Sequence, residues 1–307
     1  MSTETPTARR PWLGVLVLVV CATMWSISGP LIKTLANDGV AGITMAYYRS
    51  LLGGLVLVPF ALRRRRSLRR VRIGWPIASV ALFTVMTACF VISTAKTASA
   101  NAVILQYTSP MWVFALSPLL LKERPGLTEG LVLLIAMAGV GIIFFGHPAA
   151  ESRWLLVALA SGFGYGALTV VLRGLRAVNP LVVACMNCVG SSVLLLPAVL
   201  LWGSFKLTGY QFVLMFVLSF VQFTLPYVLF SWALQRVEAH RAALIVLLET
   251  VLNPLFTWLV VRETVPTPTL AGGPLIVAGI VGWILLVWRR KRSSLQPSVG
   301  ADHEPSG

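Results

Sequence analysis

Runs of about 20 apolar residues recur along this chain and constrain its fold more than any other feature. A run of that length crosses a hydrocarbon core of roughly 30 Å as a helix. A sheet with open edges is excluded there, because lipid offers no partner for unpaired backbone N–H and C=O groups. Composition agrees, since only 11% of the residues are charged, against roughly a quarter in soluble domains. The sequence therefore predicts an all-α integral membrane protein with ten transmembrane helices, at residues 12–32, 41–62, 73–94, 100–121, 127–146, 153–172, 180–203, 209–233, 241–261 and 267–288.

The positive charges are distributed unevenly among the loops between these predicted helices. If the N-terminus faces the cytoplasm, that side carries 19 Lys and Arg residues and the opposite side carries five. Cytoplasmic loops are enriched in this way, so the pattern predicts a protein of the inner (plasma) membrane with both termini cytoplasmic. This placement also argues against nucleic-acid binding as the reason for the net charge of +15. The seven arginines between Arg63 and Arg72 also suit anionic lipid head groups, an alternative to a purely topological role.

A pattern of charged, aromatic and glycine residues recurs at a constant offset of 140 residues. Lys33 matches Arg173, and Lys96 matches Arg236. Each half holds five predicted spans, an odd number, so the two halves cross the bilayer in opposite orientations. Inverted repeats of this kind are typical of secondary transporters. The predicted organisation is a cytoplasmic N-terminal segment (1–11), a first five-helix repeat (12–146), a second five-helix repeat (153–288) and a disordered cytoplasmic tail (289–307).

Prolines interrupt three of the predicted spans. Pro110 and Pro254 lie in corresponding spans of the two halves, although they are four positions out of register under the offset of 140. Pro226 interrupts a further span, and each proline removes a backbone hydrogen bond from its helix. Interrupted segments in matching positions of two halves indicate the binding region of a transporter. The alternative is a kink that only shapes the bundle.

Glu249 is the one acidic residue near the centre of a predicted span, and the other nine lie in loops, termini or span ends. Charge inside a membrane is costly and usually functional. Because a low dielectric disfavours the carboxylate, Glu249 is a candidate for exchanging a proton in each transport cycle or for meeting a cationic substrate group. Asn253 lies four residues on and therefore on the same helical face. The alternative is a structural glutamate that hydrogen-bonds across helices.

Arg49 lies about eight residues into its predicted span, roughly 12 Å deep, and keeps its charge there. It must therefore pair with an anion, reach a wet cavity or extend to the interface. Three roles stay open: binding a substrate carboxylate, holding helices together, or pairing with Glu249. Lys33 and Lys96 lie near span ends, where long side chains reach the interface, so they are predicted to mark topology.

Uncharged polar and aromatic residues at mid-depth supply the rest of a predicted cavity. Such side chains suit a small polar or zwitterionic molecule held by a few hydrogen bonds among apolar walls. Taken singly, each is also consistent with a hydrogen bond between packed helices. Together with Glu249, Asn253 and Arg49, the predicted substrate-binding residues are Trp25, Ser28, Gln106, Tyr107, Tyr165, Gln222 and Tyr227, while Thr84 and Thr87 lie at similar depth.

Several short motifs are distributed over both halves: Met24-Trp25-Ser26, Tyr48-Arg49-Ser50, Gln106–Pro110, Leu248-Glu249 and Asn253-Pro254. Together, over residues 12–288, they resemble the drug/metabolite transporter superfamily, EamA branch. The resemblance implies ten helices in two inverted five-helix repeats around a central cavity, and export of amino acids, related metabolites or drugs. Thr250 follows Glu249 where many members have proline, which leaves the local helix geometry open.

The residues and the resemblance predict a secondary exporter of small polar metabolites, amino acids first, that works by alternating access. Proton coupling through Glu249 is a further hypothesis. Efflux of cationic or lipophilic drugs is the alternative. A channel and a membrane-embedded enzyme are more distant, because the sequence shows no filter motif and His147, His240 and His303 are scattered. No enzymatic activity, cofactor or metal is expected; the predicted partners are a small-molecule substrate, the lipid bilayer and protons.

Overall fold

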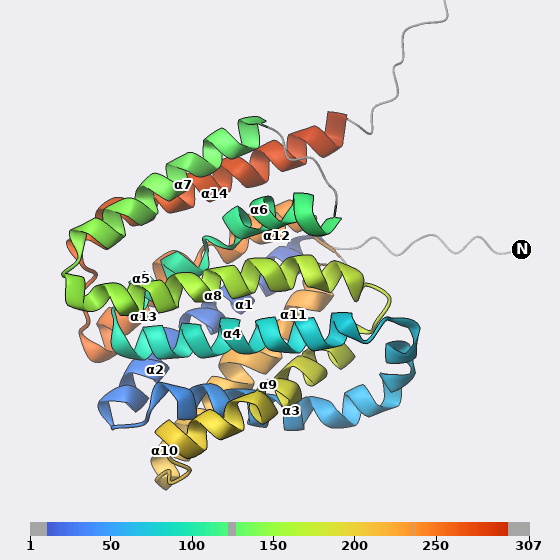
Figure 1. Cartoon of the computed structure of the whole chain (residues 1–307), viewed down its shortest axis with the longest axis vertical. Helices are drawn as coiled ribbons and strands as arrows, with labels where there is room; N and C mark the ends of the chain where they lie inside the picture. The colour runs from blue at the N-terminus through green and yellow to red at the C-terminus, as the bar shows by residue number, and fades with distance from the viewer. Residues whose placement is uncertain (1–10, 122–126, 235, 294–307) are drawn as a thin grey trace, which may run out of the picture.

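The computed structural model describes residues 11–121, 127–234 and 236–293, and over these residues the chain is helical and contains no strand (Figure 1). Residues 1–10 of the predicted N-terminal segment and 294–307 of the predicted disordered tail lie outside the described ranges. The elements are α1 (Pro11–Ser26), α2 (Ser28–Asn37), α3 (Gly42–Arg64), the 3₁₀ helix η1 (Arg65–Arg70), α4 (Gly74–Lys96), α5 (Ser99–Gln106), α6 (Ser109–Leu121), α7 (Leu127–Gly146), α8 (Ala149–Gly174), α9 (Pro180–Trp202), α10 (Gly209–Phe216), the π-helix η2 (Val217–Thr224), α11 (Leu225–Ala233), α12 (Ala239–Val246), α13 (Glu249–Val261) and α14 (Thr267–Ser293).

Within the described ranges, eight helical segments are long and apolar enough to cross a membrane. Two of the predicted spans are not among them: residues 100–121, which form α5 and α6, and α7, whose apolar stretch is Gly130–Gly146. The all-helical membrane class is confirmed, whereas the number ten stays a prediction. The eight segments are Trp12–Asn37, Gly42–Leu68, Gly74–Lys96, Ala149–Gly174, Pro180–Trp202, Gly209–Phe230, Arg241–Val261 and Thr267–Arg289.

The most extensive helix contacts join distant parts of the chain. α7 lies along α14, α3 along α9, and α4 along α8, and Figure 1 shows α7 and α14 as a pair on one side of the bundle. Large apolar side chains cover much of the outside, and Phe145 is 94% exposed and Trp202 74% exposed. Such a surface suits contact with lipid, as expected of a multi-pass membrane protein.

Two of the spans are broken at equivalent points of the chain. α5 ends at Gln106 and α6 begins at Ser109, while α12 ends at Val246 and α13 begins at Glu249, 140 residues further on in both cases. At both breaks, backbone hydrogen bonds span three residues instead of the four of an α-helix, and the bonds of the two breaks correspond at the offset of 140. They run from Thr108 N to Leu105 O (3.2 Å) and from Met111 N to Thr108 O (2.9 Å), and from Leu248 N to Ile245 O (3.0 Å) and from Val251 N to Leu248 O (3.2 Å).

The prolines do not by themselves locate these breaks. Pro110 lies in the first turn of α6, where a backbone N–H has no helical partner in any case. Pro254 lies inside α13, after its first turn. The two breaks are therefore in register although the prolines are not. Pro226 likewise follows the π-helix η2 in the first turn of α11.

Two glycines of α8 allow the broken span to lie close to it. A Cβ on Gly162 would lie 2.6 Å from the Leu105 carbonyl oxygen, and one on Gly166 would lie 2.6 Å from that of Ser109. Both distances are far below ordinary van der Waals contact. The glycines therefore let the backbone of α8 pack directly against the break between α5 and α6.

The π-helix η2 packs in the same close way against α3. The Ser219 hydroxyl donates to the Arg49 carbonyl oxygen (2.8 Å), and a Cβ on Gly53 would lie 2.7 Å from Thr224 Oγ1. π-helical turns widen a helix and occur frequently at functional sites. This contact places Arg49 of α3 beside Gln222 and Phe223 of η2.

Candidate functional site

Residues from both halves of the chain line a small central cavity of about 50 Å³. Its wall combines two opposite charges with aromatic and amide groups. Alone it is smaller than a usual ligand site, which has roughly 300–1,000 Å³. Eight of the ten predicted substrate-binding residues lie on this wall: Trp25, Arg49, Gln106, Tyr107, Tyr165, Gln222, Tyr227 and Glu249.

Glu249 lies where the two broken spans meet. It is the first residue of α13, it is buried, and the Tyr107 hydroxyl donates to its Oε2 at 2.8 Å. The Tyr107 oxygen also lies 3.1 Å from the Val246 carbonyl oxygen at the end of α12. One phenol therefore connects the break in the first half to both sides of the break in the second half.

Arg49 occupies the other side of the cavity. It is 5% exposed, and its guanidinium carbon lies 4.2 Å from the centre of the Phe223 ring and 5.7 Å from that of Phe90. Both cation–π contacts stabilise the charge without neutralising it. In the described part of the chain no ion pair joins Arg49 to Glu249, although both side chains line the cavity.

Several buried polar atoms around the cavity have no hydrogen-bond partner within the described chain. They are Arg49 Nε, Trp25 Nε1, Thr87 Oγ1 and Gln222 Oε1. Gln222 is held in place, because its Nε2 donates to the Trp25 carbonyl oxygen at 3.1 Å. Buried polar groups are normally satisfied, so this set of two nitrogen donors, a hydroxyl and an amide oxygen is suited to a polar ligand.

A larger, mostly apolar cavity of about 360 Å³ adjoins the polar one. The two share Met86, Tyr165, Phe223 and Tyr227 on their walls. The apolar cavity extends to the connection between α8 and α9. Its remaining lining residues are Leu57, Phe83, Leu168, Leu172, Leu175, Arg176, Val178, Pro180, Leu181, Val183, Ala184, Asn187, Cys188, Thr224 and Val228.

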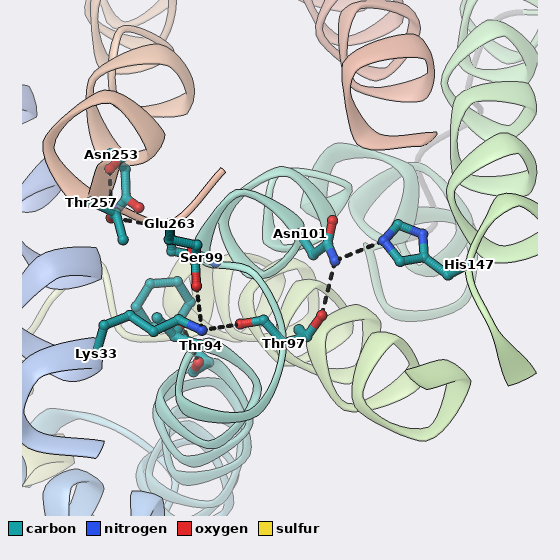
Figure 2. A network of polar contacts seen from close by, with 10 residues as sticks. Lys33, Thr94, Thr97, Ser99, Asn101, His147, Asn253, Thr257 and Glu263 are labelled. Carbon is teal, nitrogen blue, oxygen red and sulfur yellow. Dashed lines mark hydrogen bonds and ion pairs between the residues drawn. The ribbon is translucent and has the colours of Figure 1, made fainter. Parts of the chain in front are cut away.

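Ser28 and Asn253, the other two predicted site residues, bond to each other instead of lining the polar cavity. The Asn253 amide donates to Ser28 Oγ at 2.9 Å, and both side chains are fully buried. Asn253 is also part of a polar network with Thr257 and Ser99 (Figure 2). The role of Ser28 and Asn253 in binding substrate stays a prediction.

The same network gives Lys33 partners that its position near a span end did not predict. Its ammonium pairs with Glu263 at 2.5 Å and donates to the Thr97 carbonyl oxygen at 2.7 Å, and its role as a marker of topology stays a prediction. Sequence reasoning missed this pair, since no local pattern connects two residues so far apart. It also missed the cavity residues Met86, Phe90, Phe223 and Val246, because apolar side chains look like packing residues in any membrane span.

Comparison with known proteins identifies the family. The model of the EamA-like transporter family matches residues 12–145 and again residues 152–285, and the chain therefore belongs to the EamA-like transporter family. The two matched segments are themselves related by the offset of 140 found in the sequence.

Curated relatives match over nearly their whole length. An uncharacterized transporter of Archaeoglobus fulgidus is 26% identical over 279 residues, which covers 90% of this chain and 96% of the relative. The pseudopaline exporter CntI of Pseudomonas aeruginosa is 26% identical over 281 residues, covering 87% and 94%. One solved crystal structure superposes with a TM-score of 0.62 at 18% identity, over 91% of this chain and 99% of that chain, which shows a shared fold. The chain is thus a multi-pass membrane transporter of this family.

Proposed function

We propose that this transporter exports small zwitterionic metabolites with an apolar group, amino acids first, by alternating access. The observation that carries the proposal is the pair of opposite charges, Arg49 and Glu249, which line one cavity without forming an ion pair with each other. Two buried charges held apart are costly unless a third group completes them. A zwitterion supplies both missing partners at once.

The polar cavity suggests how such a substrate is held. Its ammonium group approaches Glu249 and the Tyr107 hydroxyl, and its carboxylate approaches the Arg49 guanidinium. Arg49 Nε and Trp25 Nε1 have no partner in the described chain and supply donors for carboxylate oxygens. The polar cavity holds only the head of the molecule, so the rest extends into the adjoining apolar cavity of about 360 Å³. That space favours a branched or aromatic side chain.

Ten spans in two inverted repeats are part of this proposal. Its support is the matching of helix boundaries at an offset of 140, since α5 and α12 begin at Ser99 and Ala239 and the breaks that follow them correspond. The contacts pair up in the same way, because α3 lies along α9 and α7 along α14, each with its counterpart in the other half. In alternating access, one repeat rocks against the other and opens the site to each side of the membrane in turn. Contacts between corresponding helices of the two halves are consistent with such a motion.

The orientation of the chain completes the proposal. The protein lies in the inner membrane, and both of its termini face the cytoplasm. In this orientation the apolar cavity extends toward the cytoplasmic side, where Arg176 lines it. The network around Lys33 then closes the opposite side. Loading from inside suits an exporter, and one relative bears the name of an exporter. Glu249 is the proposed proton-coupling residue, because an ionisable group in a membrane interior commonly relays protons.

Metabolite profiling of cells, in comparison with a Glu249→Gln variant at equal membrane level, tests the function first. Export predicts one or more apolar amino acids that accumulate in the medium only with the unmodified chain. Flux of the same compound in proteoliposomes, with and without a proton gradient, then tests coupling. Identical profiles for the two chains, across amino acids and their derivatives, contradict the proposal.

Efflux of organic cations is the second candidate, and one feature of the cavity favours it. Trp25 packs edge-on against Tyr227 at 5.3 Å between ring centroids, and both rings line the cavity together with Glu249. Aromatic faces beside a carboxylate recognise quaternary ammonium groups. Competition separates the two candidates, since a cation without a carboxylate displaces a drug substrate but only weakly displaces an amino acid.

A further inference from the structure

A polar network lies around Lys33 at one end of the bundle (Figure 2). The Lys33 ammonium of α2 lies 2.5 Å from Glu263 Oε2, just after α13 ends, and donates to the Thr97 carbonyl oxygen at 2.7 Å. The backbone N–H of Ser99, at the start of α5, donates to Glu263 Oε1 at 2.7 Å. One ion pair thus ties together α2, α5 and the segment that follows α13.

A second layer lies beneath this ion pair, toward the centre of the membrane. Ser99 Oγ donates to Thr257 Oγ1 at 3.0 Å, and Thr257 donates to the Asn253 carbonyl oxygen at 2.8 Å. Gly29 of α2 faces Thr257 and Asn253 so closely that a Cβ would overlap both side chains. α2 and α13 are therefore in close contact at Gly29, below the ion pair.

The position of Glu263 follows from how α13 ends. Arg262 adopts a left-handed conformation (φ 58°, ψ 25°), which is uncommon for a residue with a side chain and stops the helix. Glu263 then leaves the helix axis and reaches Lys33. The side chains of Lys33 and Glu263 are only 13% and 21% exposed, so water competes weakly for their charges.

We propose that the ion pair between Lys33 and Glu263 is the outer gate of the transporter and that its opening releases the substrate. This inference rests on the proposed alternating access. α13 links the gate to the site, because Glu249 is its first residue, Asn253 and Thr257 follow at intervals of four, and Glu263 lies just beyond its end. When the substrate or a proton reaches Glu249, α13 shifts. Glu263 moves with α13, so its ion pair with Lys33 breaks if α13 moves away from α2.

Charge reversal in the purified full chain tests this gate. Spin labels at two exposed positions on either side of the seam, Asn37→Cys and Thr264→Cys, report its width by electron paramagnetic resonance in lipid nanodiscs. Lys33→Glu and Glu263→Lys are each expected to shift the distances to longer values, because like charges then meet. The double reversal restores the pair and is expected to restore the short distances.

Two outcomes overturn the proposal: single reversals that leave the distances unchanged, or a double reversal that remains as wide as the single ones. Lys206→Glu, at an exposed residue of the same end, is the matched control and is expected to change nothing. If a charge-reversal variant does not fold, Glu263→Gln is measured instead, because it removes the negative charge without introducing repulsion. The distances are read without substrate, so they still decide the gate if amino-acid export proves wrong.

Discussion

Replacing Arg49 by methionine separates a binding role of this residue from a structural one. The substitution keeps most of the side-chain volume and removes the charge. Removing one partner of a buried ion pair costs about 3–5 kcal/mol, because the other charge is left unpaired. Within the described chain Arg49 has no such partner, and its contacts are with the rings of Phe90 and Phe223. The stability of the folded protein is therefore expected to change little.

Transport is expected to respond very differently. A hydrogen bond to a charged group contributes about 1.5–3 kcal/mol. Loss of the contact between Arg49 and a substrate carboxylate therefore weakens binding about 10- to 150-fold at 1.4 kcal/mol per tenfold. An amine analogue of the same substrate, which has no carboxylate, lacks this contact. Its binding is expected to be the same in the Arg49→Met variant and in the unmodified chain.

Counterflow in proteoliposomes, with an amino acid and its decarboxylated amine measured side by side, gives these affinities. Thermal melting of the purified variant in detergent gives the stability. Equal losses for the amino acid and the amine, or a melting temperature that collapses, refute the reasoning and assign Arg49 to the structure. Arg49→Lys is the control, because it keeps the charge but loses the planar geometry that binds both carboxylate oxygens.

The remaining predictions concern the carboxyl, the apolar cavity and the helix contacts. Glu249→Gln is expected to abolish pH-dependent export in proteoliposomes while the variant inserts normally, and pH-dependent export that persists in the variant counts against coupling. Leu168→Trp fills part of the apolar cavity. It is expected to weaken transport of phenylalanine about tenfold more than that of alanine, which corresponds to about 1.4 kcal/mol of binding free energy. Equal effects on the two amino acids mean that the cavity is only a passage. Gly162→Ala is expected to cost about 1–3 kcal/mol, read as a lower melting temperature, because its Cβ meets the Leu105 carbonyl oxygen. Gly74→Ala, where nothing lies within 4 Å, is the matched control and leaves the melting temperature unchanged.

The chemistry of the lipid solvent explains what was predictable from the sequence. Apolar runs of about 20 residues leave helices as the only spanning structure, so the all-helical class follows from composition and length. The same cost of polarity singles out Glu249 and Arg49, because a charge inside a span is expensive wherever it lies. Both line the central cavity together with six other residues that the sequence predicted for the site.

Tertiary contacts decided the rest, since they join residues that no local pattern connects. The spans break in register at Tyr107 and Leu247, although their prolines are four positions out of register, and the Tyr107 hydroxyl connects the two breaks. Lys33 pairs with Glu263, which is 230 residues away in the sequence, so no local pattern predicts this contact. The sequence by itself determined a bundle of membrane helices with two buried charges. Packing between distant helices then brings Arg49 and Glu249 to one cavity without an ion pair between them and pairs Lys33 with Glu263 at one end of the bundle, because these contacts join residues far apart in the sequence.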